Sequence, residues 1–191
     1  MYGSRTLLAL TFGSGTQVFT LDPDCGAFVL TSAAVEIPRE TREYAINGSN
    51  HRHWDEAVRL YVADCQKGAS GPHGTDFNTR WNASLVAEAT RILTRGGIYL
   101  YPADARPNYR QGRLRLTYEA NPIAFLVEQA GGGASDGRSR ILDLVPAALH
   151  QRVPLVFGSR REVERIARYY AAPQDTGETS PLFGRRSLFR V

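Results

Sequence analysis

The residues best suited to chemistry lie in one run, from Gly112 to Pro122, with the sequence GRLRLTYEANP. In a β-strand, the apolar side chains of this run share one face, namely Leu114, Leu116 and Tyr118. The polar side chains share the opposite face, namely Arg113, Arg115, Thr117 and Glu119. Two guanidiniums match phosphate oxygens in geometry and charge, and the neighbouring carboxylate could hold a metal ion that bridges to the anion. The run therefore predicts an anion site, although a solvated strand face with one cross-strand ion pair fits the same pattern.

The rest of the chain predicts the elements that position this run. Before Ile37, strands are expected over 6–10, 18–21 and 27–31, with a turn at 22–26. After Ile37, strands are expected over 98–101, 141–145 and 154–157. Helices are expected over 55–66 and 84–94, from 121 to the glycines at 131–133, and from 159 onward. This alternation predicts an α/β fold with a mixed β-sheet flanked by helices.

Several residues are typical of helix ends. Asn121 is expected to cap the helix after the polar run, with Pro122 at its first position. Ser159 and Glu162 form a capping-box pattern at the start of the last helix. The buried face of that helix is expected to hold four residues, namely Val163, Ile166, Ala167 and Tyr170.

The composition is typical of a compact protein that binds small ligands. The chain has 191 residues, 42% of them hydrophobic, and a formal net charge of +4. Its arginines are scattered among acidic residues, so nucleic-acid binding is not expected. No apolar run reaches the ~18 residues of a membrane span, and the first residues lack a signal-peptide pattern. Cys25 and Cys65 are therefore expected to be free thiols in a reducing cytoplasm.

Longer motifs resemble one enzyme family. They are AINGSN at 45–50, RGGIYLYPA at 95–103, the run from 112 to 132, LHQRVPLVFGS at 149–159 and SPLFGRR at 180–186. In this order, and over nearly its whole length, the chain closely resembles the C-terminal half of class I fructose-1,6-bisphosphatases of the bacterial type. The family's N-terminal half, which carries the metal loop, has no counterpart in these motifs.

The resemblance implies the layered sugar-phosphatase fold and a division of the chain. Residues 1–36 are expected to be orphan antiparallel strands of the family's N-terminal sheet. Residues 37–170 are expected to form the C-terminal α/β domain that binds the sugar phosphate, and 171–191 a C-terminal tail.

The resemblance also implies roles for individual residues. Matched residue by residue, the substrate-binding residues are Asn47, Arg80, Trp81, Tyr101, Arg113 and Arg115. Glu119 matches a carboxylate ligand of the catalytic divalent metal, expected to be Mg²⁺, and no residue is assigned as catalytic. Without the resemblance, Asn47 suits a turn, Tyr101 a core aromatic and Arg80 the surface. Glu119 could equally pair with an arginine of its own run.

Several positions depart from the family pattern, among them Glu88 and Thr90, which take places usually held by Asp and His. Arg113 stands where the family has a phosphate-binding Lys, and a planar fork differs from a point ammonium in reach and specificity. Trp81 and Asn50 each replace a Tyr. His150 is expected to be structural, since no second histidine is placed to form a metal pair.

The implied activity is Mg²⁺-dependent hydrolysis of the 1-phosphate of fructose 1,6-bisphosphate in carbohydrate metabolism, in gluconeogenesis or the Calvin cycle. Because Glu119 is a single metal ligand, the chain alone is expected to have little or no phosphatase activity. Two alternatives stay open: a non-catalytic sugar-phosphate-binding or regulatory module that needs a partner half, and a relative acting on sedoheptulose 1,7-bisphosphate. The family is usually tetrameric, and an Arg80 that crosses between subunits implies at least a homodimer.

Overall fold

The structure is a computed structural model that describes residues 5–172. Its first part is a three-stranded antiparallel sheet with the order β1-β2-β3. The strands are β1 (Leu7–Thr11), β2 (Thr16–Asp22) and β3 (Ala27–Ser32). The predicted turn joins β2 to β3, so the three strands expected before Ile37 are confirmed.

The second part is a mixed five-stranded sheet with the order β5-β4-β6-β10-β8. The strands are β4 (Glu43–Ala45), β5 (Asn78–Thr79), β6 (Ile98–Tyr101), β8 (Gly133–Ser135) and β10 (Leu155–Gly158). β4 runs parallel to β5 and β6, whereas β10 runs antiparallel to β6 and β8. A separate two-stranded ladder joins β7 (Leu114–Arg115) to β9 (Arg152–Val153).

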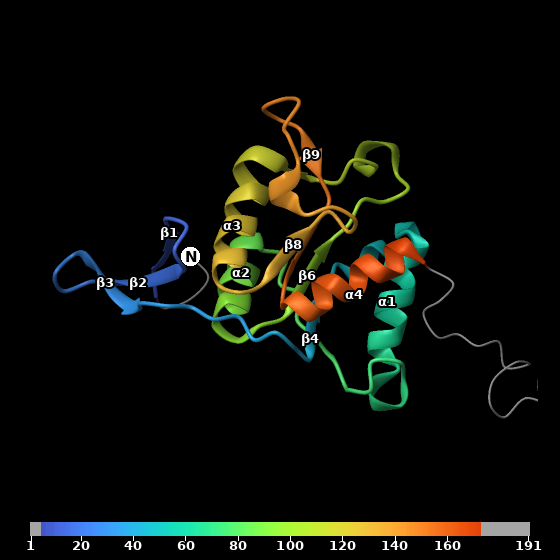
Figure 1. Cartoon of the computed structure of the whole chain (residues 1–191), viewed down its shortest axis with the longest axis horizontal. Coiled ribbons are helices and arrows are strands. Elements are labelled where there is room, and N and C mark those ends of the chain that lie inside the picture. The colour runs from blue at the N-terminus through green and yellow to red at the C-terminus, as the bar shows by residue number, and fades with distance from the viewer. Residues whose placement is uncertain (1–4, 173–191) are drawn as a thin grey trace, which may run out of the picture.

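Four helices cover the two faces of the mixed sheet. They are α1 (Glu56–Gln66), α2 (Leu85–Arg95), α3 (Asn121–Gln129) and α4 (Arg160–Ala171). Figure 1 shows α1 and α4 on one side of the sheet and α2 and α3 on the other. The prediction of a mixed sheet flanked by helices is therefore confirmed. None of the helices between residues 5 and 172 is both long and apolar enough to cross a membrane.

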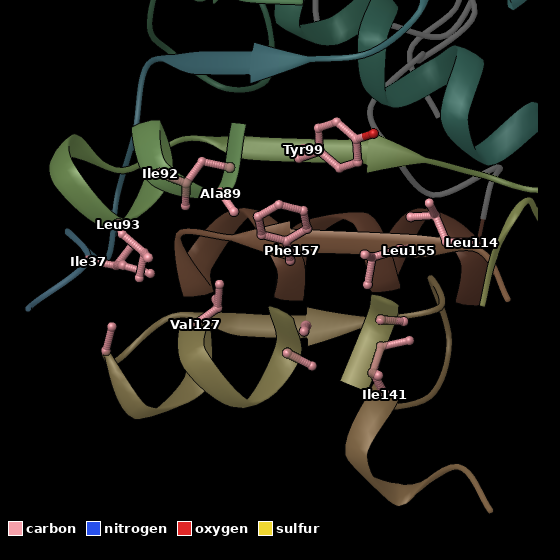
Figure 2. Packing of buried hydrophobic residues seen from close by; sticks show 14 of the residues in the cluster. Ile37, Ala89, Ile92, Leu93, Tyr99, Leu114, Val127, Ile141, Leu155 and Phe157 are labelled. Atoms are coloured by element: carbon pink, nitrogen blue, oxygen red, sulfur yellow. The ribbon is translucent and has the colours of Figure 1, made fainter. Parts of the chain in front are cut away.

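The strands of the mixed sheet feed two cores because successive side chains point to opposite faces. Tyr99, Leu155 and Phe157 belong to the core under α2 and α3, whereas Leu100 and Val156 belong to the core under α1 and α4. Figure 2 shows the first core, where Tyr99 of β6 lies beside Phe157 of β10 with a ring-centroid distance of 5.1 Å. Full burial of a side chain such as Phe157 stabilises the fold by about 1.5–3 kcal/mol.

The three-stranded sheet is attached to α3 by hydrogen bonds at the start of β2. The hydroxyl of Thr16 donates to the carbonyl of Leu126 at 2.7 Å, and the N–H of Gly15 donates to Gln129 Oε1 at 3.0 Å. Figure 1 shows the sheet extending away from the mixed sheet beyond this contact. As a result, β3 leaves Val29 and other apolar side chains exposed.

The helices expected over 55–66 and 84–94 are confirmed, and local capping explains where they begin. Asp55 Oδ1 accepts the N–H of Val58 at 3.1 Å at the start of α1. Ser84 Oγ accepts the N–H of Ala87 at 3.3 Å at the start of α2. Both caps satisfy backbone donors that have no partner within the helix.

The prediction of one long strand over the polar run is wrong. The strand ends at Arg115, and the chain continues as a π-helical turn, Leu116–Ala120. Leu116 and Ala120 are both fully buried at a helical spacing, whereas Tyr118, expected in the core, is 47% exposed. The apolar residues recur every two positions as far as Leu116 and at a helical spacing after it. Burial of Ala120 favours the helical spacing for the second half of the run.

Two predicted caps are also wrong. Asn121 has helical backbone angles of φ −61° and ψ −47°, because the π-helical turn already leads into α3, so Pro122 is its second residue. Ser159 does not cap α4 with its side chain. Its Oγ instead accepts the N–H of Gly97 at 3.2 Å, which ties the start of α4 to β6.

Two smaller differences concern the chain after residue 140. The segment expected as a strand over 141–145 is a single 3-10 turn, Ile141–Asp143, which buries Ile141 without a partner strand. On α4, Tyr169 is buried in place of the expected Tyr170, which is half-buried. The expected tail lies outside the described residues beyond Ala172, and so does the SPLFGRR motif. Cys25 and Cys65 are free thiols, as predicted.

Candidate functional site

A small hollow at the end of β6 brings together three of the predicted substrate-binding residues, Asn47, Tyr101 and Arg113. Asn47 follows β4, Tyr101 is the last residue of β6, and Arg113 directly precedes β7. Two further polar residues line the hollow, namely Asn50 and Asp104. The side-chain oxygen of Asn47 accepts the N–H of Ser49 at 3.1 Å, so Asn47 also forms the turn that its sequence context suggests.

Arg113 is held in the hollow by aromatic rings and a carboxylate. Its guanidinium carbon lies 3.7 Å from the ring centroid of Tyr109 and 5.5 Å from that of Tyr101. Its Nη2 lies 3.4 Å from Asp104 Oδ2. A cation over an aromatic face gains about 0.5–2 kcal/mol, so these rings fix a positive charge at the rim.

Asp104 is buried and binds a second guanidinium. Arg106 donates from Nε to Asp104 Oδ1 at 3.0 Å and from Nη2 to Oδ2 at 2.5 Å. These hydrogen bonds from Arg106, with a smaller one from Arg113, outweigh burial and lower the pKa of Asp104 to about 2. The carboxylate is therefore ionised at neutral pH.

An aromatic group forms the wall beside this hollow. Trp81 stacks on Tyr99 with a centroid distance of 5.7 Å and an interplanar angle of 16°, and lies 6.0 Å from Tyr101. Burial, followed by the charges of Tyr101, Glu88 and Glu119, raises the pKa of Tyr99. Asn47 and Trp81 also line an open groove of about 790 Å³. A neutral aromatic wall beside a cationic rim suits a ligand with a carbon ring and an anionic group.

Arg80 directly follows β5, next to Trp81, and is held by one acidic residue. Its Nε donates to Glu43 Oε1 at 3.1 Å. Glu43 Oε2 also accepts Arg91 at 2.6 Å and lies 3.2 Å from Arg95. Burial would raise the pKa of Glu43, but its hydrogen bond to Arg80 and the charges of the three arginines together lower it. The side chain of Arg80 keeps 45% of its surface exposed.

Glu88 is a further acidic residue of this ion-pair cluster. It is fully buried on α2 and accepts Arg91 Nε at 2.9 Å and the backbone N–H of Asn82 at 3.2 Å. The segment that carries Arg80 and Trp81 is thus attached at both ends, through Glu43 and Glu88. Ala83, in the same segment, has a φ of 61°, a conformation that is uncommon for residues other than glycine.

Arg115 and Glu119 lie together at the junction of β7 and the π-helical turn. Glu119 Oε2 accepts the backbone N–H of Arg115 at 2.7 Å, and Arg115 Nη1 lies 3.8 Å from the same oxygen. Arg113 and Arg115 therefore contact different carboxylates. The alternation of side chains that predicts one polar face for the whole run holds only over β7.

Glu119 could give an oxygen ligand to a hard cation such as Mg²⁺. Within residues 5–172, however, no group of three or more histidine, cysteine or acidic side chains is arranged to hold a metal ion. The donors present near Glu119 therefore do not make up a metal site by themselves.

Sequence reasoning missed four residues of the site, namely Glu43, Asp104, Arg106 and Tyr109. Asp104 and Arg106 stand two residues apart in the loop after Tyr101, which is a signal that the sequence offered. Glu43 carried no such signal, because its partner Arg91 is 48 residues away. His150, expected to be structural, bonds through Nδ1 to the hydroxyl of Tyr118 at 3.0 Å.

Comparisons with known proteins agree on one family. A family profile described as "Fructose-1-6-bisphosphatase, C-terminal domain" matches residues 37–171. A protein of Sinorhizobium medicae named fructose-1,6-bisphosphatase class 1 is 61% identical over 191 residues, which is all of this chain and 55% of that protein. The protein of the same name from Acidiphilium cryptum is 62% identical over all of this chain and 53% of its own length. The chain spans about half the length of the curated relatives it matches.

A solved structure agrees with the sequence relatives. The holo form of Leishmania major fructose-1,6-bisphosphatase superimposes with a TM-score of 0.83 at 40% sequence identity. The match covers 89% of this chain and 50% of that one. At this identity and TM-score the two chains share the fold.

Proposed function

The chain belongs to the fructose-1,6-bisphosphatase family, and from that premise we propose that residues 37–171 bind the phosphorylated sugar for Mg²⁺-dependent hydrolysis of the 1-phosphate of fructose 1,6-bisphosphate. The observation that carries the proposal is the convergence of Asn47, Tyr101 and Arg113 on one hollow. Arg113 supplies charge, Asn47 an amide and Tyr101 a hydroxyl. Together they suit the phosphate at the end of the sugar that does not react.

The aromatic and cationic parts of the site divide the work of binding. Trp81, which is supported by its stacking on the buried Tyr99, excludes water from one wall and positions the sugar. Arg115, 39% exposed beside Glu119, would orient the reacting phosphate. Holding two ends of one substrate fixes the scissile bond relative to the rest of the site, which lowers the entropic part of the barrier.

Glu119 is the residue that would hold Mg²⁺ in this chain. When bound, the cation neutralises phosphoryl oxygens and lowers the pKa of a bound water. Because one carboxylate cannot form the whole site, the remaining ligands would come from residues other than 5–172. We therefore propose that these residues alone bind sugar phosphate and that turnover requires a partner half.

The three-stranded sheet is the proposed contact surface for that partner half. Its outer strands β1 and β3 have no further strand beside them among the described residues. Leu8 on β1 is 41% exposed, and Phe28 and Leu30 on β3 are 44% and 46% exposed. An exposed apolar edge of this kind favours addition of further strands.

A binding experiment tests the proposed function. Fructose 1,6-bisphosphate and fructose 6-phosphate are titrated calorimetrically into the chain, with fructose as the control for phosphate dependence. The variant Arg113→Gln should bind both phosphates at least tenfold more weakly, since one charged contact is lost. Arg59→Gln removes an exposed arginine of α1 with no side-chain partner among residues 5–172, and it should bind as the unaltered chain does. Equal affinity for fructose and fructose 6-phosphate would contradict the proposal.

We also propose that Arg80 acts across a homo-oligomer interface, in the site of a neighbouring copy. Arg80→Gln and Arg113→Gln each damage every site of a pure oligomer. When the two variants are mixed, a hybrid oligomer contains a site whose Arg113 comes from the Arg80→Gln chain and whose Arg80 comes from the Arg113→Gln chain. Both arginines are present, so that site is intact. Mixing should therefore restore part of the bisphosphate binding, whereas an Arg80 that acts within its own chain predicts no recovery.

A further inference from the structure

Two guanidiniums converge on one carboxylate at the rim of the hollow. Arg106 and Arg113 both reach Asp104 Oδ2 through Nη2, at 2.5 Å and 3.4 Å. Asp104 therefore holds the two guanidiniums next to each other, with other donors of each left free of this carboxylate. A tetrahedral phosphoryl group presents three oxygens and can span two such donors.

The ring of Tyr109 holds the two guanidiniums in a fixed relation. The guanidinium carbon of Arg113 lies 3.7 Å from the ring centroid, and that of Arg106 lies 4.8 Å from it. Tyr109 itself belongs to a 3-10 turn, Pro107–Tyr109, that is closed by its N–H to the carbonyl of Arg106 at 2.9 Å. The pair is thus positioned by its own loop before any ligand arrives.

The hydrogen-bond donors of the pair are only partly used. A guanidinium carries five N–H donors. Arg106 directs its Nε and Nη2 to Asp104 and a further Nη2 bond to Asn50 Oδ1 at 2.9 Å, and none of its Nη1 donors is bonded within residues 5–172. Arg113 uses one Nη2 donor on Asp104. Two cations facing one carboxylate leave one net positive charge and several donors for an external anion.

The space around the pair determines where that anion would lie. The hollow measures about 10 Å³, which holds at most one water molecule. The side chains of Arg106 and Arg113 are 31% and 22% exposed. An incoming phosphoryl group therefore contacts the guanidiniums from the open rim and does not enter the hollow.

We propose that Arg106 is a second phosphate-binding residue of the substrate site, which grips the non-reacting phosphate together with Arg113 while Asp104 and Asn50 orient its fork. This inference rests on the proposed function and deepens it. It gives a role to Asn50, which stands where the resembling family has an aromatic hydroxyl, because its amide oxygen positions the guanidinium. A two-guanidinium clamp also selects a phosphate dianion over a neutral sugar end.

The test compares Arg106→Gln with Arg110→Gln, which removes an exposed arginine of the same loop that has no side-chain partner among residues 5–172. Inorganic phosphate and fructose 1,6-bisphosphate are titrated calorimetrically into the unaltered chain and both variants. We expect Arg106→Gln to weaken binding of both ligands at least tenfold and Arg110→Gln to change it less than twofold. Arg106→Lys keeps the charge but not the planar fork of donors, and its affinity should lie between those of Arg106→Gln and Arg110→Gln.

A thermal readout guards against a purely structural effect, because Arg106→Gln also removes the partner of Asp104. Phosphate should raise the melting temperature of the unaltered chain and of Arg110→Gln, as binding to the folded state requires. In Arg106→Gln the increase should be lost, whatever the melting temperature without phosphate.

The outcomes separate this inference from the proposed function. If both variants bind the bisphosphate as tightly as the unaltered chain, the role of Arg106 is refuted and the proposed function is retained. If inorganic phosphate binds in an Arg106-dependent way while the bisphosphate does not bind, the anion clamp stands and the proposed substrate is wrong. If none of the ligands binds, both fail.

Discussion

Gly112 offers a sharp test of how the fold positions Arg113, the residue that follows it. Gly112 has a φ of 81°, and a Cβ added there would lie 2.2 Å from Val153 C, 2.3 Å from Pro154 N and 2.4 Å from Val153 O. These are backbone atoms of β9 and its end, so no side-chain rotation can relieve the contact. Gly131 has nearly the same φ of 82° but has nothing within 4 Å of the equivalent position. The two glycines thus share backbone strain and differ in steric contact.

The size of the effect follows from this difference. Alanine in a left-handed conformation costs about 1–2 kcal/mol, and both substitutions carry that cost. At Gly112 the chain must also move β7 away from β9, and overpacking of this kind adds about 1–3 kcal/mol. Gly112→Ala should therefore lower the free energy of unfolding by about 2–5 kcal/mol, and Gly131→Ala by about 1–2 kcal/mol.

Urea unfolding, followed by circular dichroism, measures both free energies. Phosphate binding gives a second readout, because a displaced β7 carries Arg113 away from Tyr109 and Asp104. Binding should weaken in Gly112→Ala and stay unchanged in Gly131→Ala. A difference of about 0.5 kcal/mol is within the usual effect of a surface substitution. If the free energies of unfolding of the two variants differ by less than that, the contact of Gly112 with Val153 and Pro154 does not have the effect that we expect.

Three further predictions concern charged groups. Glu43→Gln should lower the free energy of unfolding by about 1–2 kcal/mol. The exposed ion pairs with Arg80 and Arg95 contribute little, and the half-buried pair with Arg91 contributes most. Unchanged urea unfolding would count against this prediction. Burial, helped by the charge of Arg165, lowers the pKa of His73 to about 4. As the pH falls from 6.5 to 4, the unfolded chain binds a proton at this histidine and the folded chain does not, so the free energy of unfolding should fall over that range. Thermal melts over that range should show a flatter profile in His73→Gln. Asp104→Asn should destabilise the chain by about 1–2 kcal/mol at pH 7, and the difference should vanish as the pH falls from about 4 to 2, where the folded carboxyl also becomes protonated.

The sequence predicted most of the elements because their signals are local. Asp55 and Ser84 cap α1 and α2 at the expected places, since each cap bonds a residue three positions on. The strand over 98–101 was predicted with the bounds that β6 has. The run after Leu114 misled because its apolar residues fit two periods, and only the burial of Ala120 favours the helical one.

The candidate site was predictable in part. Family motifs led to Asn47, Tyr101 and Arg113, which share one hollow in the structure. The carboxylates that hold Arg80 and Arg113 were not found. One of them, Glu43, meets Arg91 only once the sheet and α2 have packed together. The substrate roles of the site residues stay predictions that the phosphate titrations test, and the metal role of Glu119 also stays a prediction.

The sequence by itself determined where α1 and α2 begin, the bounds of β6 and which family the chain resembles, because these depend on neighbours a few positions apart. The tertiary structure alone decided that Arg113 turns to Asp104 and Tyr109 while Arg115 turns to Glu119. A guanidinium takes the nearest carboxylate and aromatic face that packing supplies, and the spacing of residues along the chain does not encode that distance.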